Sequence, residues 1–267
     1  MSKIGCIGTG NMGGALARAI GKGGHELYLS DFCREKAEAL AAEIGGGARA
    51  VGNAEIVGEC DVILLGVKPQ MLPSLADELR EGLAARKKRV CLVSMAAGVT
   101  LAKLGELFGC TRPVIRIMPN TPAAVGAGMI LWCENEHASE ADKDLLCAAL
   151  SFAGKLDRLS ENLIDAASAV AGCGPAFVCL FLEALADGGV RCGLPRDKAL
   201  AYAIETLKGT ATLLAESGKH PARVKDEVCS PGGSTIEGVT ALENGGFRAL
   251  TIDAVTAAFK RTKELGK

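Results

Sequence analysis

The chain of 267 residues can bury one large core or two smaller ones, and its length alone does not decide between them. Hydrophobic residues make up 49% and aromatic residues 4%, and the formal net charge is −1, which excludes a basic nucleic-acid surface and a disordered acidic chain. The start "MSKIGCIG" lacks a signal-peptide core, and no apolar run approaches the roughly 18 residues of a membrane span, so we expect a soluble cytoplasmic protein with no membrane partner.

The eleven cysteines occur singly, with no C-x-x-C pair, and many lie in apolar runs such as "GCIG" and "FVCLF". Such a distribution is typical of buried, reduced thiols and indicates neither a disulfide framework nor a zinc site. We therefore expect no metal.

Short apolar strands alternate with helical stretches from residue 1 to about 160. Strands bounded by Gly or Pro and separated by helix-length segments predict βαβ units and a doubly wound, mostly parallel sheet of the Rossmann type. The expected strands are Ile4–Gly8, Glu26–Ser30, Asp61–Val67, Val90–Ser94, Val114–Met118 and Gly128–Cys133, and the expected helices include Met12–Ile20, Arg34–Glu43 and Gln70–Leu83.

Strand signals stop after residue 160, where long Ala- and Leu-rich segments begin. The sequence therefore predicts an α/β dinucleotide-binding domain over 1–160 and an all-helical domain over 161–267. The expected helices of the second domain are Glu161–Ala171, Ala176–Cys192, Arg196–Ser217, Ala222–Val228, Thr235–Glu243 and Phe247–Leu265. Several are apolar on more than one face, which favours a helical dimer interface.

The N-terminal stretch "IGCIGTGNMGGALARAI" has Gly8, Gly10 and Gly13 in G-x-G-x-x-G spacing between a predicted strand and a predicted helix. In such a turn the first glycine permits the tight bend, the second admits a pyrophosphate, and the third lets helix and strand pack closely. This context predicts that the first domain binds a dinucleotide.

The end of the second strand carries two competing signals for the cofactor. Asp31, after Ser30, stands where a carboxylate accepts the ribose 2′-hydroxyl of NAD(H), whereas Arg34 could meet the 2′-phosphate of NADP(H). Asp31 could also cap the following helix. The residues leave these alternatives open.

The chain offers few groups for acid/base chemistry. Its three histidines lie in predicted loops, and although Gly172 and Gly174 match a glycine pattern of the β-hydroxyacid dehydrogenases, Val178 stands at their catalytic lysine position. A C=N nitrogen is basic enough to arrive protonated, so imine reduction mainly needs correct placement of substrate and cofactor. The sequence therefore favours an imine reductase.

Several segments spread over essentially the whole chain carry a family resemblance. They are "IGTGNMGGAL", "LLGVKPQ", "SMAAGV", "IRIMPNTPAAVGAG", "ENLIDAASAVAGCGPAF", "LADGGVRCGLPR" and "VKDEVCSPGGSTIEGV". In this order they resemble the pyrroline-5-carboxylate reductases, which reduce 1-pyrroline-5-carboxylate to L-proline in the last step of proline biosynthesis.

The resemblance implies a nicotinamide cofactor on the first domain. The matching positions are Gly8, Gly10, Asn11 and Met12 in the phosphate-binding turn, Asn53 near the adenosine 2′ end, Val67 and Lys68 at a strand end that borders the cofactor, and Ala97 at the nicotinamide end. With Ser30, Asp31 and Arg34 they form the expected cofactor site.

The resemblance also implies a substrate site in the helical domain. Glu161 is similar to a residue close to the bound product, and the loop of Ser230, Gly233, Ser234 and Thr235 matches the one that grips the carboxylate of 1-pyrroline-5-carboxylate. The Thr235 hydroxyl addresses the ring nitrogen, which makes Thr235 the expected catalytic residue. Family members are dimers with interleaved helical domains, so we expect a homodimer or a higher oligomer of dimers, with one subunit's substrate loop facing its partner's cofactor.

Two positions depart from the family pattern. Glu227 stands where some members have an asparagine near the cofactor, and Asp31 follows Ser30 where some NADPH-preferring members have a second small polar residue. Family habit favours NADPH whereas Asp31 favours NADH. The expected cofactor is therefore NADPH, with NADH tolerated.

The stretch "SPGGSTIEG" is predicted to begin a helix. Ser234 and Glu237 would form a capping box, in which each satisfies a backbone amide of the other. The capping box leaves the amides around Gly232 and Gly233 without partners at the helix N-terminus, and we expect these amides to hold the substrate carboxylate. Two other functions also stay open, namely reduction of a six-membered cyclic imino acid and non-catalytic dinucleotide binding on the same fold.

Overall fold

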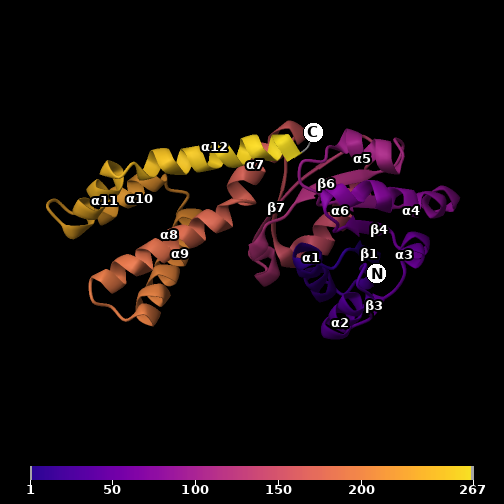
Figure 1. Ribbon diagram of the computed structural model, residues 1–267, viewed down its shortest axis with the longest axis horizontal. Coiled ribbons are helices and arrows are strands. Elements are labelled where there is room, and N and C mark those ends of the chain that lie inside the picture. The colour runs from indigo at the N-terminus through magenta and orange to yellow at the C-terminus, as the bar shows by residue number, and fades with distance from the viewer. Residues whose placement is uncertain (1, 266–267) are drawn as a thin grey trace. The chain divides into compact units, whose positions relative to one another are not determined.

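The computed structural model describes residues 2–265, which separate into two compact units (Figure 1). The first contains the described residues up to Cys173 together with those from Ala258 on, and the second contains Gly174–Ala257. The last described strand ends at Arg158, and every described element from Glu161 on is a helix. We keep 1–160 and 161–267 as a proposed division by architecture.

An eight-stranded sheet forms the centre of the first unit. Its strand order is β3-β2-β1-β4-β5-β6-β7-β8, and only the β6–β7 pair is antiparallel among the paired strands described. The strand order turns back between β1 and β4, and open α/β sheets bind ligands at the carboxyl ends of the strands at such a point. The strands are β1 Lys3–Ile7, β2 Glu26–Ser30, β3 Arg49–Ala50, β4 Val62–Leu65, β5 Cys91–Ser94, β6 Val114–Met118, β7 Gly128–Glu134 and β8 Gly154–Arg158.

Helices cover both faces of this sheet. One apolar cluster joins the sheet to α1, α2 and α6, a second joins it to α3, α4 and α5, and a smaller third joins β6 and β7 to α7. The helices are α1 Asn11–Lys22, α2 Arg34–Ile44, α3 Asn53–Glu59, α4 Leu72–Ala85, α5 Leu101–Phe108, α6 Glu140–Leu150 and α7 Glu161–Ala171, with short 3-10 turns at Pro69–Met71, Thr121–Val125 and Ser151–Ala153. The doubly wound prediction is confirmed.

Two strands are missing from the sequence prediction, although the six predicted strands occur within two residues of their expected bounds. β3 has only two residues, and one of them is Arg49. β8 reads "GKLDR" and is largely exposed, so it lacks the apolar run by which the other strands were identified. Edge strands of this kind carry little hydrophobic signal because one or both of their faces stay in water.

The second unit is helical, as predicted. α8 and α9 pack against each other as a hairpin (Figure 1). His220 is an exposed loop residue, as predicted, and it also caps α10, since its Nδ1 accepts a hydrogen bond from the Ala222 amide at 3.2 Å. The helices are α8 Gly174–Arg191, α9 Arg196–Ser217, α10 Pro221–Val228, α11 Ser234–Asn244 and α12 Phe247–Leu265, the last of which continues into the first unit.

Many large apolar side chains of the helices after residue 160 are exposed in the single chain. The expectation that no apolar run approaches the length of a membrane span is wrong, because Glu161–Arg191 contains an 18-residue stretch with a mean hydropathy of 1.9. The turn signal "GCGP" divides this run in the sequence, and in the structure Gly172 and Cys173 separate α7 from α8. Exposed apolar helix faces have a second explanation, because a helical dimer buries such faces against the partner chain.

The eleven cysteines are free, but the prediction that they are buried is wrong for Cys110, Cys179 and Cys192, which are exposed. Cys179 lies on α8, whose apolar character extends to faces that the single chain leaves uncovered. Cys6 and Cys91 are buried as expected, and burial raises the pKa of each thiol to about 12. These two thiols are therefore poor nucleophiles.

Candidate active site

The glycines of the N-terminal turn differ in why they lack a side chain. Gly8 has φ +97°, and a Cβ there would lie 2.6 Å from the Gly66 carbonyl oxygen. A Cβ on Gly13 would lie 2.0 Å from the Gly8 carbonyl oxygen, which is closer than any real contact. Around Gly10, by contrast, nothing in the described chain lies within 4 Å of such a Cβ. Packing therefore explains Gly8 and Gly13, whereas Gly10 leaves open space above a helix start.

This open space lies at the N-terminus of α1. Gly10 is the N-cap, no side chain caps the helix, and its first turn contains no acidic residue within the part of the chain described. Asn11 and Met12 are the first two residues of the helix. An uncapped helix start with free amides and a positive dipole end attracts an anion, so these residues fit a pyrophosphate.

Asp31 closes the turn that follows β2. Its Oδ2 accepts hydrogen bonds from the Thr9 amide at 2.7 Å and the Thr9 hydroxyl at 3.0 Å, and its Oδ1 accepts one from the Cys33 amide at 3.0 Å. Cys33, not Asp31, is the N-cap of α2, so the helix-cap alternative is wrong. Partial burial disfavours the charged carboxylate, but these three hydrogen bonds outweigh it and lower the pKa of Asp31.

We predict that Asp31→Asn weakens the binding of NADH and NADPH alike. The substituted amide nitrogen would face the Thr9 donors, so the glycine turn loses its anchor and the protein loses roughly 1–2 kcal/mol of stability. Because the folded-state pKa is lowered, the carboxylate stabilises the fold fully above its ordinary value of 3.8, and the advantage over the variant shrinks as pH falls through the lower folded value. Urea unfolding at several pH values and titration with both cofactors measure this. Weaker NADH binding together with tighter NADPH binding would instead indicate a direct ribose contact.

The expected adenosine end contains one open acceptor. Asn53 Nδ2 donates to Glu78 Oε1 at 2.7 Å, while Asn53 Oδ1 is buried and has no hydrogen-bond partner among residues 2–265. Such an atom is costly unless a ligand or water donates to it, so it fits a ribose hydroxyl. Arg34 is exposed, and its Nε donates to Glu38 Oε1 at 2.8 Å. The Ser30 carbonyl oxygen accepts from the Gly8 amide at 2.7 Å, which joins β2 to the turn.

The expected nicotinamide end lies at the same edge of the sheet. Val67 and Lys68 follow β4, and Ala97 lies in the loop that follows β5, the neighbouring parallel strand. Carboxyl ends of parallel strands meet at one edge, so the structure brings these segments to the edge where the glycine turn follows β1. Lys68 is exposed, whereas Ala97 packs against the third apolar cluster.

Sequence reasoning missed a buried ionic network next to this loop. Arg116 of β6 is 1% exposed and lies 3.4 Å from Glu161 Oε1 and 2.6 Å from Asp165 Oδ1, both in the first turns of α7. Glu161 Oε1 also accepts a hydrogen bond from the Leu101 amide at 2.6 Å. The available signal was the strand "VIRIM", because an arginine in an otherwise buried strand needs a carboxylate partner.

The predicted substrate loop forms the N-terminus of α11. The predicted capping box is absent, because Gly233 is the N-cap, Ser234 is already helical, and no side chain caps the helix in the part of the chain described. The Gly233 amide, expected to be free, donates to the Ser230 carbonyl oxygen at 3.0 Å, since Gly232 with φ +66° closes a tight turn. The amides left open are therefore those of the first helical turn, including Ser234 and Thr235.

Ser230 lies over this helix start. A Cβ on Gly233 would lie 2.3 Å from Ser230 Oγ, so the side chain of Ser230 occupies the space that a residue at 233 would need. Ser230 is exposed and Thr235 is half-buried. The structure thus brings Ser230, Gly233, Ser234 and Thr235 together in one turn.

Glu227, the departure from the family pattern, is engaged within its own unit. It accepts hydrogen bonds from Lys219 Nζ at 2.8 Å and from Arg223 Nε at 3.2 Å. The hydrogen bond from Lys219 lowers the pKa of Glu227. The carboxylate therefore links Lys219, which precedes α10, to Arg223 within that helix.

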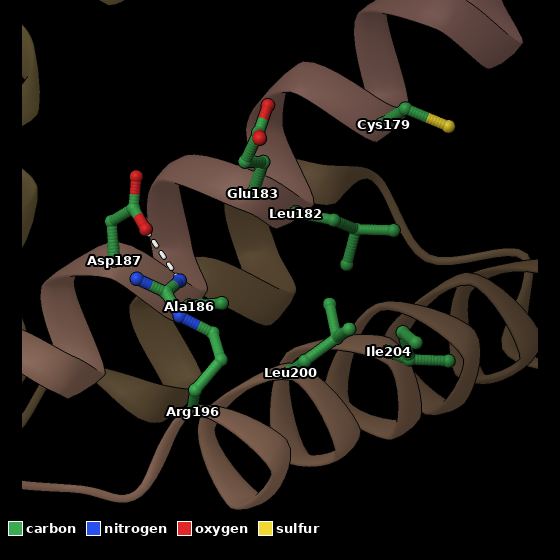
Figure 2. A pocket seen from close by; sticks show the side chains of 8 residues that line it. All are labelled: Cys179, Leu182, Glu183, Ala186, Asp187, Arg196, Leu200 and Ile204. Carbon is green, nitrogen blue, oxygen red and sulfur yellow. Dashed lines mark hydrogen bonds and ion pairs between the residues drawn. The ribbon is translucent and has the colours of Figure 1, made fainter.

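A groove between α8 and α9 lies within the second unit, and none of the predicted site residues lines it (Figure 2). Figure 2 shows Leu182, Leu200 and Ile204 facing its interior, with the ion pair of Asp187 and Arg196 at one end. Over residues 2–265, no group of three His, Cys, Asp or Glu side chains could hold a metal ion. The groove is an apolar surface between two helices.

The doubly wound sheet, the glycine turn at its switch point and the uncapped start of α1 define a dinucleotide-binding protein of the Rossmann type. Residues 3–98 match the model of the NADP oxidoreductase, coenzyme F420-dependent family, and residues 161–265 match that of pyrroline-5-carboxylate reductase dimerisation. The chain belongs to the pyrroline-5-carboxylate reductase family.

Individual relatives support this assignment over most or all of the chain. A pyrroline-5-carboxylate reductase of Arabidopsis thaliana is 40% identical over 99% of this chain and 96% of its own length. One of Synechocystis sp. is 46% identical over 80% of this chain and 79% of its own. The crystal structure of Plasmodium falciparum pyrroline carboxylate reductase with NADP bound superposes with a TM-score of 0.88 at 30% identity, covering 100% of this chain and 98% of that one.

Proposed function

We propose that this chain reduces the C=N bond of 1-pyrroline-5-carboxylate to give L-proline, with NADPH as the preferred cofactor and NADH as a tolerated one. Membership of the family supports the reaction. The observation that carries the proposal is the uncapped N-terminus of α11, where Thr235 places a hydroxyl beside open backbone amides. No second function has a comparable observation in its favour.

The chain's own residues fit the cofactor at three places. The amides at the start of α1 would hold the pyrophosphate above Gly10, and Asn53 Oδ1 would accept a ribose hydroxyl. Val67, Lys68 and Ala97 would border the nicotinamide end. When bound, NADPH supplies the hydride for the reduction.

The loop 230–235 would bind and orient the imino acid. The amides of Ser234 and Thr235 would hold the carboxylate at the positive end of α11, and the Ser230 hydroxyl lies beside them. The Thr235 hydroxyl would hydrogen-bond the ring nitrogen and hold its proton in place. Because the imine nitrogen is basic enough to be protonated already, Thr235 acts mainly by positioning the ring and contributes little general acid catalysis.

We predict that Thr235→Ala lowers kcat/KM for 1-pyrroline-5-carboxylate by roughly 10²-fold, the scale of a positioned proton-transfer group. Thr240→Ala is the matched control, because the Thr240 hydroxyl on the same helix donates to the Ile236 carbonyl oxygen at 2.9 Å and to no other atom among residues 2–265. Steady-state kinetics of both variants, with circular dichroism to verify folding, measure the effect. Near-normal turnover of a folded Thr235→Ala protein would exclude the role.

The second unit supports a homodimer. The chain carries the family's dimerisation domain over residues 161–265. Its exposed apolar faces, including the groove of Leu182, Leu200 and Ile204 in Figure 2, would be buried against a second copy. We propose that this association, and not a membrane, covers Glu161–Arg191, and assembly of dimers into a higher oligomer is part of the same proposal. A cytoplasmic location, with no nucleic-acid partner, stays a prediction.

A further inference from the structure

The Glu161 carboxylate ties the start of α7 to the loop between β5 and α5. It accepts the Leu101 amide at 2.6 Å, and Leu101 is the first residue of α5, directly after the segment 95–100 that contains Ala97. A hydrogen bond to an ionised carboxylate is roughly twice as strong as one between neutral groups. This contact therefore fixes the end of the loop.

Arg116 holds this carboxylate in place. Its guanidinium is buried in β6 and contacts both Glu161 and Asp165, which lie four residues apart and so share one face of α7. In the sheet, Arg116 pairs with Ser94, the last residue of β5 before the loop. Its Nε is buried without a hydrogen-bond partner among residues 2–265. A network with an unsatisfied donor is not optimised for stability alone, which indicates a second role for the placement of its carboxylates.

Apolar contacts join the same two elements. Ala97 and Leu101 pack against the third cluster, which contains Ile164 of α7 and against which Ala167 of α7 also packs. The loop is thus fixed to α7 by one charged contact and by one small patch of core. Loss of the charged contact would leave the loop attached but less precisely placed.

We propose that Glu161 is a positioning residue for hydride transfer: held by Arg116, it fixes the segment 95–101 and with it the nicotinamide end of the cofactor, without touching the substrate. This inference rests on the proposed function, in which Ala97 borders the nicotinamide. Hydride transfer depends steeply on the placement of the reacting atoms, and a shift of about 1 Å can cost about 10²-fold in rate.

Three variants separate this role from a direct substrate contact. Glu161→Ala removes the acceptor of the Leu101 amide, and Glu161→Gln keeps a carbonyl oxygen there but removes the charge. Glu140→Ala is the matched control, because Glu140 is likewise the first residue of a helix, α6, and its ion-pair partner is the side chain of Lys143. A general effect of removing a carboxylate from a helix start would appear in the control as well.

The expected result is a loss confined to the hydride step. Glu161→Ala lowers kcat about 30-fold and Glu161→Gln about 3-fold, whereas Glu140→Ala leaves kcat unchanged. The dissociation constant of 2′,5′-ADP, a probe of the adenosine end, changes less than about 2-fold in all three. The primary isotope effect with NADPH deuterated at the transferred hydrogen rises in Glu161→Ala. A higher KM for the imine with unchanged kcat, or an equal loss in Glu140→Ala, would overturn the inference.

Amide hydrogen exchange tests the same contact without turnover. The Leu101 amide should exchange at least about 10-fold faster in Glu161→Ala than in the unchanged protein, because its acceptor is gone. Equal exchange rates would overturn the inference whatever the kinetics show. An unchanged protein that fails to reduce the imine would refute the proposed function, and the exchange measurement would still decide whether Glu161 fixes the loop.

Discussion

Gly13→Ala is expected to abolish cofactor binding and to prevent stable folding of the first domain. The new Cβ would lie 2.0 Å from the Gly8 carbonyl oxygen, and the backbone on both sides is held by α1 and by the turn after β1. Such a clash with backbone cannot be relieved by rotation of a side chain, so its cost should exceed the roughly 1–3 kcal/mol of ordinary overpacking. Thermal unfolding and NADPH titration by fluorescence measure both effects.

Gly10→Ala is the informative counterpart of this variant. Nothing in the described chain lies within 4 Å of a Cβ at position 10, so the fold should tolerate the methyl group and lose at most about 1 kcal/mol at the helix start. The methyl group would occupy the space assigned to the pyrophosphate, and we expect affinity for NADPH to fall about 100-fold, equivalent to roughly 2.7 kcal/mol. Undiminished NADPH affinity in a folded Gly10→Ala protein would contradict the cofactor site.

Asp165→Ala should destabilise the first domain by about 3 kcal/mol or more, because it leaves a buried arginine with its weaker partner only. Arg116 is 1% exposed, and after the substitution its nearest carboxylate oxygen would be Glu161 Oε1 at 3.4 Å. Breaking an exposed pair costs far less, and Asp77→Ala, which removes the surface partner of Arg80, should cost less than about 1 kcal/mol. Denaturant unfolding of the two variants gives the comparison.

The double variant Arg116→Met, Asp165→Ala decides whether the buried charge is the cause. Methionine removes the guanidinium that lacks a partner, so the double variant should be more stable than Asp165→Ala alone even though it carries one more substitution. The remaining Glu161 carboxylate is about one-third exposed and can be hydrated. A double variant at least as unstable as the sum of its single changes would contradict this explanation.

The sequence predicts the sheet and the phosphate turn because both depend on local patterns. β4 is a short, wholly apolar run and β1 is apolar after Lys3, and the glycine pattern lies within a few residues of one strand and one helix. β8 cannot be predicted in this way, because "GKLDR" is a polar edge strand whose position depends on its pairing with β7. Local pattern predicts core strands well and edge strands poorly.

In the candidate site, too, residues that are neighbours in the chain could be predicted and contacts between distant residues could not. Residues of the loop 230–235 are neighbours in the chain and could be predicted together, but the choice of Gly233 over Ser234 as N-cap depends on backbone angles that both residues can adopt. The partners of Glu161 could not be predicted, because Leu101 is 60 residues away and meets it only through the packing of α7. The network of Arg116 depends on tertiary contacts that no local motif encodes.

The central claim is tested most directly by following the oxidation of NADPH and of NADH with 1-pyrroline-5-carboxylate and with its six-membered ring homologue. We expect NADPH to be consumed in step with the formation of L-proline, and kcat/KM for the five-membered ring to exceed that for the six-membered ring by about 10-fold or more, the scale of one methylene group in a fitted pocket. Tight NADPH binding without consumption, or a preference for the six-membered ring, would contradict the account.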